Sequence, residues 1–176
     1  MGAKCIEDID DEFQIYLTDE KLARNVKLLL SMAKGAKIVS LKWFEACQKA
    51  GKLILNKDIE KYYINDKEFE KAYQCNLKQI YSNDLSNLLE NQKVYVSKNI
   101  KGVAKAQLET IVSAIGGTIS NERQLKSSNI CIMDPENDAK QIIEIKKTKN
   151  HPHIVKIHYL LDGILKLKLI VADHSI

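Results

Sequence analysis

Two cationic side chains near the start of a predicted helix are the first candidates for chemistry in this 176-residue chain. The apolar spacing of residues 21–33 predicts a helix that follows the capping signal Thr18-Asp19. Arg24 and Lys27 lie three residues apart on this segment, so they share one side of the helix near its start. Taken alone, an arginine and a lysine on one helical turn most often form a solvated surface.

Histidine and cysteine side chains could bind a metal ion, but their spacing in this sequence does not favour a metal site. The cysteines are scattered without a CxxC pair, and the histidines fall on a predicted loop, strand and helix with no cysteine or carboxylate at ligand spacing: Cys5, Cys47, Cys75, Cys131, His151, His153, His158 and His174. We expect reduced thiols, surface histidines, no metal and no cofactor. The acidic run over residues 7–12 is interpreted as a solvated turn, because the alternating oxygen ligands and glycine of a calcium loop are missing.

Composition narrows the class of function. No nucleophile elbow, phosphate-cradling glycine loop or paired-carboxylate centre is visible, which predicts a protein that is not an enzyme. Residues 93–176 hold 13 basic and 8 acidic side chains against 14 and 15 in residues 1–92, a bias too weak to favour direct DNA binding. The longest apolar run, residues 164–172, is interrupted by Lys166 and Lys168, so we expect no membrane span and a soluble protein of the cytosol or nucleus.

The elements that must position these residues centre on residues 34–55, which contain the only tryptophan, Trp43. A short apolar strand at Ile38 and Val39 is followed by a helix with Trp43, Phe44 and Cys47 on one buried face, and Gly51 ends it. This places Trp43 in the core rather than on a base-stacking surface. The same pattern recurs 116 residues later, where Ile38, Val39, Trp43 and Phe44 correspond to Ile154, Val155, Tyr159 and Leu160, which indicates an internal duplication.

The duplication predicts two α/β units. Residues 93–176 read strand, helix, strand, strand, helix, strand, helix, with Gly116-Gly117 between the first helix and second strand. Residues 1–64 read strand, strand, helix, strand, helix, with strands near residues 3–6 and 13–17, so we expect this unit to lack a first strand and helix. Residues 65–92 form a linker whose apolar spacing predicts a helix packed between the units, through Phe69, Tyr73, Leu77, Ile80 and Tyr81.

With these patterns the chain resembles a tandem pair of BRCT domains of DNA-damage-response proteins. The resemblance covers essentially the whole sequence and rests on Gly116-Gly117, the apolar strand pairs and residues 38–53, IVSLKWFEACQKAGKL. It implies an α/β fold of two repeats, each with a small parallel sheet flanked by helices. It also implies a nuclear adaptor that binds a phosphoserine motif, with the phosphorylated histone tail at DNA breaks and chromatin-associated repair proteins as partners.

The resemblance also assigns the site. Lys27 stands where such pairs contact phosphate, Arg24 where readers of the histone tail bind the peptide's carboxylate end, and Asn25 where the family often has a supporting threonine. Arginine suits a carboxylate because its planar fork can donate two hydrogen bonds. The family's phosphate site also uses a hydroxyl and a glycine amide after the first strand, which this first unit lacks. Ser97 holds the equivalent place in the second unit, where we expect a structural or solvated serine.

The sequence is also compatible with two other functions. Many BRCT repeats are phosphate-independent interaction scaffolds, and the expected lack of a first strand makes this alternative a serious competitor. Binding of DNA or poly(ADP-ribose) through the more basic second unit would instead show a steep salt dependence.

Overall fold

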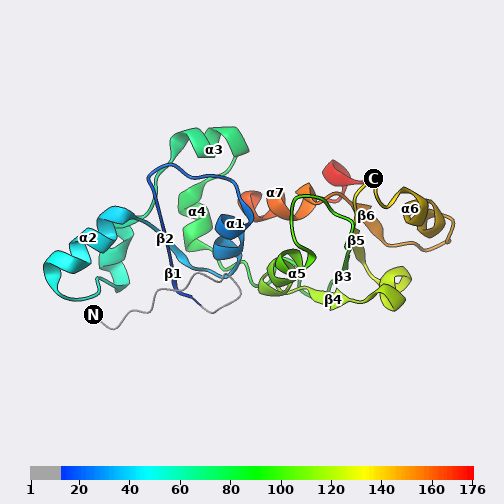
Figure 1. Ribbon diagram of the computed structural model, residues 1–176, viewed down its shortest axis with the longest axis horizontal. Helices are drawn as coiled ribbons and strands as arrows, with labels where there is room; N and C mark the ends of the chain where they lie inside the picture. Colours follow the sequence, from blue (N-terminus) through cyan, green and yellow to red (C-terminus); the bar gives the residue numbers. More distant parts are fainter. Residues whose placement is uncertain (1–12) are drawn as a thin grey trace.

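The computed structural model describes residues 13–176, which form two α/β units side by side along the long axis of the molecule (Figure 1). The first unit has two parallel strands and two helices, namely β1 Ile15–Thr18, α1 Val26–Ala33, β2 Lys37–Ser40 and α2 Leu41–Ala50. Tyr16 of β1 lies opposite Ile38 of β2. The strands expected near residues 3–6 and the acidic turn at 7–12 lie outside the described residues.

The second unit has a four-stranded sheet with the order β4-β3-β5-β6, in which every neighbouring pair is parallel. Its elements are β3 Lys93–Val96, α5 Lys105–Ala114, β4 Thr118–Ser120, β5 Ile130–Ile132, α6 Ala139–Lys146, β6 His153–Val155 and α7 His158–Lys166. Helices cover both faces of this sheet, so Val94, Tyr95 and Val96 of β3 are all buried. The predicted α/β class with small parallel sheets is confirmed.

Gly116 and Gly117 follow α5, and close contacts with neighbouring atoms require glycine at both positions. Gly116 has φ +88°, and a Cβ atom there would lie 2.2 Å from the backbone oxygen of Ser86. A Cβ atom on Gly117 would lie 2.6 Å from Cγ1 of Val112. Only glycine fits both the left-handed conformation and the close backbone approach that lead the chain into β4.

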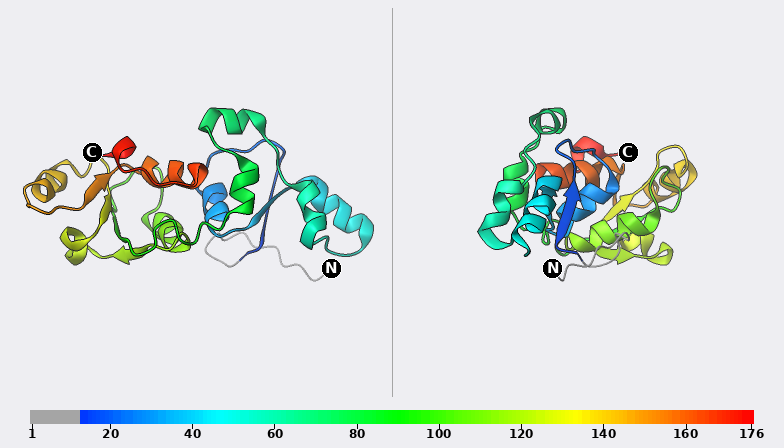
Figure 2. Two further views of the ribbon diagram at one scale, coloured as in Figure 1. Left: turned by 180° about the vertical axis from the view of Figure 1, so that it is seen from behind. Right: turned by 60° about the vertical axis from the view of Figure 1, so that its left-hand side comes forward.

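The connector between the units forms two short helices rather than the single helix expected. They are α3 Lys67–Tyr73 and α4 Leu77–Ser82, and Gln74 between them is in the left-handed conformation. A 3₁₀ helix over Asn56–Tyr62 precedes the connector in the first unit. Figures 1 and 2 show α4 beside α1 from the front and from behind. The connector packs into the main core through five buried residues, Phe69, Leu77, Ile80, Leu85 and Leu89.

The 116-residue repeat recurs in backbone detail. The equivalent strands β2 and β6 both make an isolated antiparallel bridge, from Val39 to Tyr63 and from Val155 to Ser175. The equivalent helices α2 and α7 both end in a left-handed residue, at Gly51 and Leu167. Alternation along the strands places Ile38 in the cluster with α1 and Val39 in the cluster with α2.

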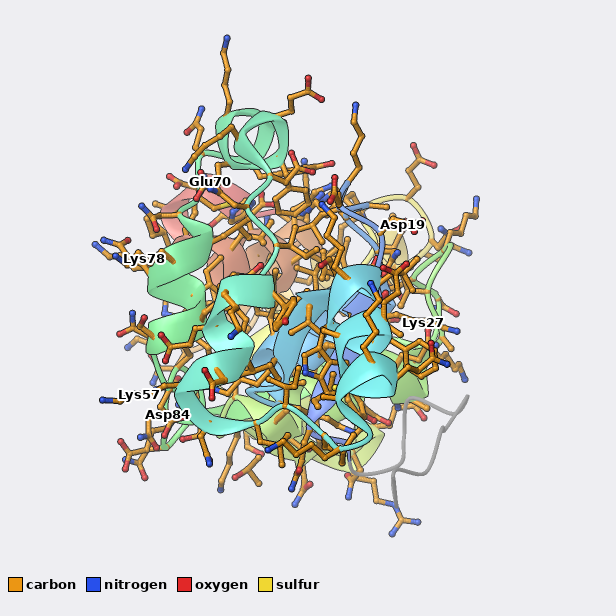
Figure 3. All side chains as sticks on the ribbon, turned by 90° about the vertical axis from the view of Figure 1, so that its left-hand side faces the viewer. Asp19, Lys27, Lys57, Glu70, Lys78 and Asp84 are labelled. Atoms are coloured by element: carbon orange, nitrogen blue, oxygen red, sulfur yellow. The ribbon has the colours of Figure 1, made fainter. Side chains whose placement is uncertain are left out.

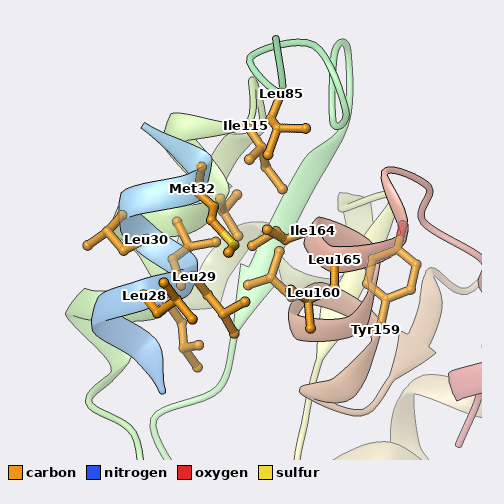
Figure 4. Close-up of a cluster of buried hydrophobic side chains, with 14 of the residues drawn as sticks. Leu28, Leu29, Leu30, Met32, Leu85, Ile115, Tyr159, Leu160, Ile164 and Leu165 are labelled. Atoms are coloured by element: carbon orange, nitrogen blue, oxygen red, sulfur yellow. The ribbon is translucent and has the colours of Figure 1, made fainter. Parts of the chain in front are cut away.

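Helix α1 is the centre of the molecule. All six residues from Leu28 to Ala33 are buried, because α1 lies between its own strand β2, the connector, and helices α5 and α7 of the second unit. Figure 4 shows Leu28, Leu29 and Met32 facing Leu160 and Ile164 across this interface. A helix that is apolar all round requires burial on every side, and only its first turn reaches solvent.

Two details of the sequence analysis are wrong. Helix α1 begins at Val26, not near residue 21, and its cap is Asn25 instead of Thr18-Asp19. Phe44 is 44% exposed and lies off the buried face of α2. Trp43 is buried as expected, packs with Val39, Cys47 and Ile59, and donates its indole N–H to the carbonyl of Ile54 at 2.8 Å.

Leu30→Ala should lower the free energy of unfolding by about 2–5 kcal/mol, because it removes a fully buried side chain from the core that joins the two units. Leu41→Ala is the matched control. Leu41 is 47% exposed, and its truncation should cost less than about 1 kcal/mol. Urea denaturation measures both, and equal losses would contradict the central role of α1.

Candidate functional site

The candidate site lies at the N-terminus of α1. Asn25 adopts an extended conformation, with φ −126° and ψ 168°, and its side-chain oxygen accepts the N–H of Leu28 at 2.8 Å. The first N–H groups of any helix have no partner within the helix. Because Asn25 satisfies only Leu28, the N–H groups of Val26 and Lys27 have no acceptor within residues 13–176. Asn25 is thus a helix cap beside two open donors.

Lys27 is the second residue of α1 and is exposed. It has no ion-pair partner in the part of the chain that the structure describes. Figure 3 shows Lys27 on the same side of the molecule as Asp19 and on the opposite side from Lys78. Among the described residues, the ammonium group therefore has no ion-pair partner and lies next to the positive end of the helix dipole, where an anion is stabilised.

Arg24 precedes the helix instead of lying on it. Its guanidinium donates a hydrogen bond to Asp162 of α7 in a mostly buried ion pair, with 16% and 25% of the two side chains exposed. It also lies 5.3 Å from the centre of the Tyr73 ring, a cation–π distance. The Nε of Arg24 is buried and has no hydrogen-bond partner in the described structure. Arg24 is therefore fixed at the junction of the two units.

Asp162 joins the first unit to the C-terminal segment. One carboxylate oxygen accepts from Arg24, and the other lies 3.8 Å from Nε2 of His174, whose ring is edge-on to that of Tyr159. Asp162 follows Arg24 by 138 residues, so no local pattern could have revealed the pair.

The loop before α1 is held by a second acidic residue that the sequence analysis missed. Asp66 accepts the N–H groups of Phe69 and Leu22, each at 2.9 Å, and these bonds, led by that of Phe69, lower the pKa of its carboxyl group below the ordinary value. Asp66 caps α3 and at the same time ties the connector to the segment that carries Arg24. An aspartate before a predicted helix is a capping signal that the sequence contains, so the role of Asp66 at α3 could have been predicted. Its bond to Leu22 joins distant residues and leaves no such signal in the sequence.

The structure places Arg24, Asn25 and Lys27 near one helix end but gives them different surroundings. No described group of three or more histidine, cysteine or acidic side chains could hold a metal ion. Burial raises the pKa of the Cys131 thiol to about 12, which makes it a poor nucleophile. None of the helices within residues 13–176 has both the length and the apolar character needed to cross a bilayer.

The chain is related to known proteins over most of its length. Residues 87–174 match the model of the BRCT domain. The mediator of DNA damage checkpoint protein 1 of Homo sapiens is 27% identical over 154 residues, which are 86% of this chain and 7% of that protein. The chain therefore spans only a small part of this relative. The sequences of residues 24–35 and 94–120 predict a likeness to the C-terminal BRCT pairs of this mediator and of PAX-interacting protein. The likeness to the mediator is confirmed.

Solved structures agree on the fold. The BRCT5-BRCT6 domains of S. pombe Brc1 superimpose with a TM-score of 0.66 at 24% identity, covering 88% of this chain and 79% of the other. Rtt107p, solved in complex with a phosphorylated histone, gives a TM-score of 0.53 at 14% identity, covering 86% and 70%. The family match and the shared tandem architecture lead to one conclusion, that this chain belongs to the BRCT domain family.

Proposed function

We propose that the chain is a non-enzymatic adaptor of the DNA damage response in the nucleus, which binds a phosphoserine peptide and reads the phosphorylated histone tail at DNA breaks. The observation that carries the proposal is the N-terminus of α1, where an unpaired lysine stands beside two open N–H donors within the described residues. Chromatin-associated repair proteins are its partners in this role.

The chemistry of phosphoserine matches these donors. At neutral pH the phosphate carries close to two negative charges and has three acceptor oxygens. Lys27 supplies a full positive charge, and the N–H groups of Val26 and Lys27 supply directional donors at the positive end of the helix dipole. The burial of Leu28–Ala33 holds this end of the helix in a fixed place, so the donors need no rearrangement when the anion binds.

Arg24 is proposed to bind the carboxylate end of the peptide. A guanidinium has five N–H donors, and its bond to Asp162 uses only one of them. Asp162 and Tyr73 hold the group in one orientation, which reduces the entropy lost when a second carboxylate binds. Asn25 supports both residues by capping the helix between them.

The relatives support this role. The mediator protein is named for the DNA damage checkpoint, and Rtt107p has been solved with a phosphorylated histone. The competing function, a phosphate-independent scaffold, would bind its partner equally well with and without phosphate.

Lys27→Met should weaken binding of the full chain to a phosphorylated histone-tail peptide by more than about tenfold, because it removes a charge-assisted bond to phosphate. Lys78→Met is the matched control, since Lys78 is an exposed helical lysine on the opposite side and should leave affinity unchanged. Calorimetry with the phosphorylated and unphosphorylated peptides measures both. Equal affinity for the two peptides would support the scaffold function instead.

Arg24→Ala should weaken binding of the same phosphopeptide by about tenfold when its C-terminus is a free carboxylate, and by much less when the terminus is amidated. The difference between the two peptides isolates the carboxylate contact from any loosening of the interface that follows loss of the Asp162 bond. Fluorescence anisotropy with both peptides provides the measurement. An identical loss for the acid and the amide would leave Arg24 a purely structural role.

A further inference from the structure

The net charge of the chain is gathered in one stretch of the second unit, residues 139–156, which we call the basic segment. It holds one acidic side chain, Glu144, and five lysines, namely Lys140, Lys146, Lys147, Lys149 and Lys156. Its net charge is therefore +4, which equals that of the whole chain, because the other residues hold 22 basic and 22 acidic side chains. Averaged over residues 93–176 this charge is too dilute to favour DNA binding, but the basic segment concentrates it.

The five lysines of the basic segment are all exposed. None of them forms an ion pair within residues 13–176, although Glu144 lies on the same helix, α6. Lys140 and Lys147 are seven residues apart, so they lie on one face of α6 with Ile143, which is 56% exposed. The segment thus presents a set of cations that no described carboxylate neutralises.

Hydrogen bonds hold the loop of the basic segment at both ends. Thr148 closes the end of α6, where its N–H and its hydroxyl donate to the carbonyl of Ile145 at 3.0 and 2.6 Å. At the start of β6, the N–H of His153 donates to the carbonyl of Asn129 at 2.9 Å. The lysines on either side of Thr148 therefore project from an anchored backbone.

We propose that the basic segment binds the phosphate backbone of double-stranded DNA without sequence preference. Lysines supply point charges on flexible stems, which suit a row of phosphates that is read for its charge alone. The segment contains no phenylalanine, tyrosine or tryptophan on which unpaired bases could stack, so a duplex fits it better than a single strand does.

The basic segment lies away from the candidate site. Figures 1 and 2 show α6 and the loop after it at the end of the molecule opposite α2, with α1 between the two ends. DNA bound at this end leaves the N-terminus of α1 accessible, so both surfaces can be occupied at once. The DNA contact goes beyond the function proposed for Lys27 and does not depend on it.

The test titrates the full chain, without any peptide, into a labelled duplex of about 20 base pairs at salt concentrations from about 50 to 200 mM. Fluorescence anisotropy gives the affinity at each concentration. The triple variant Lys146→Gln, Lys147→Gln and Lys149→Gln should bind more than about tenfold more weakly at the lowest salt. Its slope of log affinity against log salt should be smaller by about two to three.

The matched control is the triple variant Lys49→Gln, Lys52→Gln and Lys57→Gln in the first unit. These lysines are also exposed, and Lys49 lies in the last turn of α2 as Lys146 does in α6, so the two variants lose the same charge from similar places. The control should keep the slope of the unmodified chain, because distant surface charges are screened by salt.

Equal losses in the two triple variants would overturn the proposal, as would no measurable binding of the duplex by the unmodified chain. Tighter binding of a single strand of the same sequence would also contradict it, and equal affinity for polyglutamate would indicate an acidic protein partner instead. Should the triple variant fail to fold, Lys149→Gln alone decides, since Lys149 lies beyond the end of α6. Its loss should lower the slope by about one, and an unchanged slope would overturn the proposal.

Discussion

The burial of α1 on all sides is the constraint on which the rest of the structure depends. From Leu28 onward the helix is closed in by β2, the connector and the second unit, so the two units share one core. Only its first turn remains in contact with solvent. The element that joins the units is therefore also the element that presents Asn25 and Lys27, and the position of these residues relative to the second unit is set by hydrophobic packing.

The ion pair between Arg24 and Asp162 adds a directional contact to this apolar interface. Taking a guanidinium and a carboxylate out of water is costly, and the cost is offset here by their mutual hydrogen bond and by the Tyr73 ring. Such a pair does more for orientation than for stability. It fixes the segment before α1 against α7, while Asp66 fixes the same segment against the connector.

The two units use one architecture with different polar groups at equivalent places. In the first unit the N-cap Asn25 turns inward to its own helix, and the lysine that follows is left without an ion-pair partner among the described residues. In the second unit the N-cap Asp138 turns away from its helix toward Ser97 and Asn99. The equivalent strands and helices of the two units thus share their apolar pattern, which the core constrains, while the polar residues at the helix ends differ.

The sequence by itself determined the class of fold, because its information lies in local periodicity. Alternating strands, the helices that follow them and the glycine stops depend on neighbours within one turn or one strand, and the burial of Trp43 follows from the same pattern. The 116-residue repeat is visible because each copy carries this local pattern. Tertiary structure decided the start of α1, since Asp66, 44 residues away, accepts the N–H of Leu22 in the loop before the helix. It also decided the surroundings of Arg24, whose partner Asp162 lies 138 residues away. Contacts between distant charges leave no periodic trace in a chain, so their geometry arises only when the packed core brings the loops together.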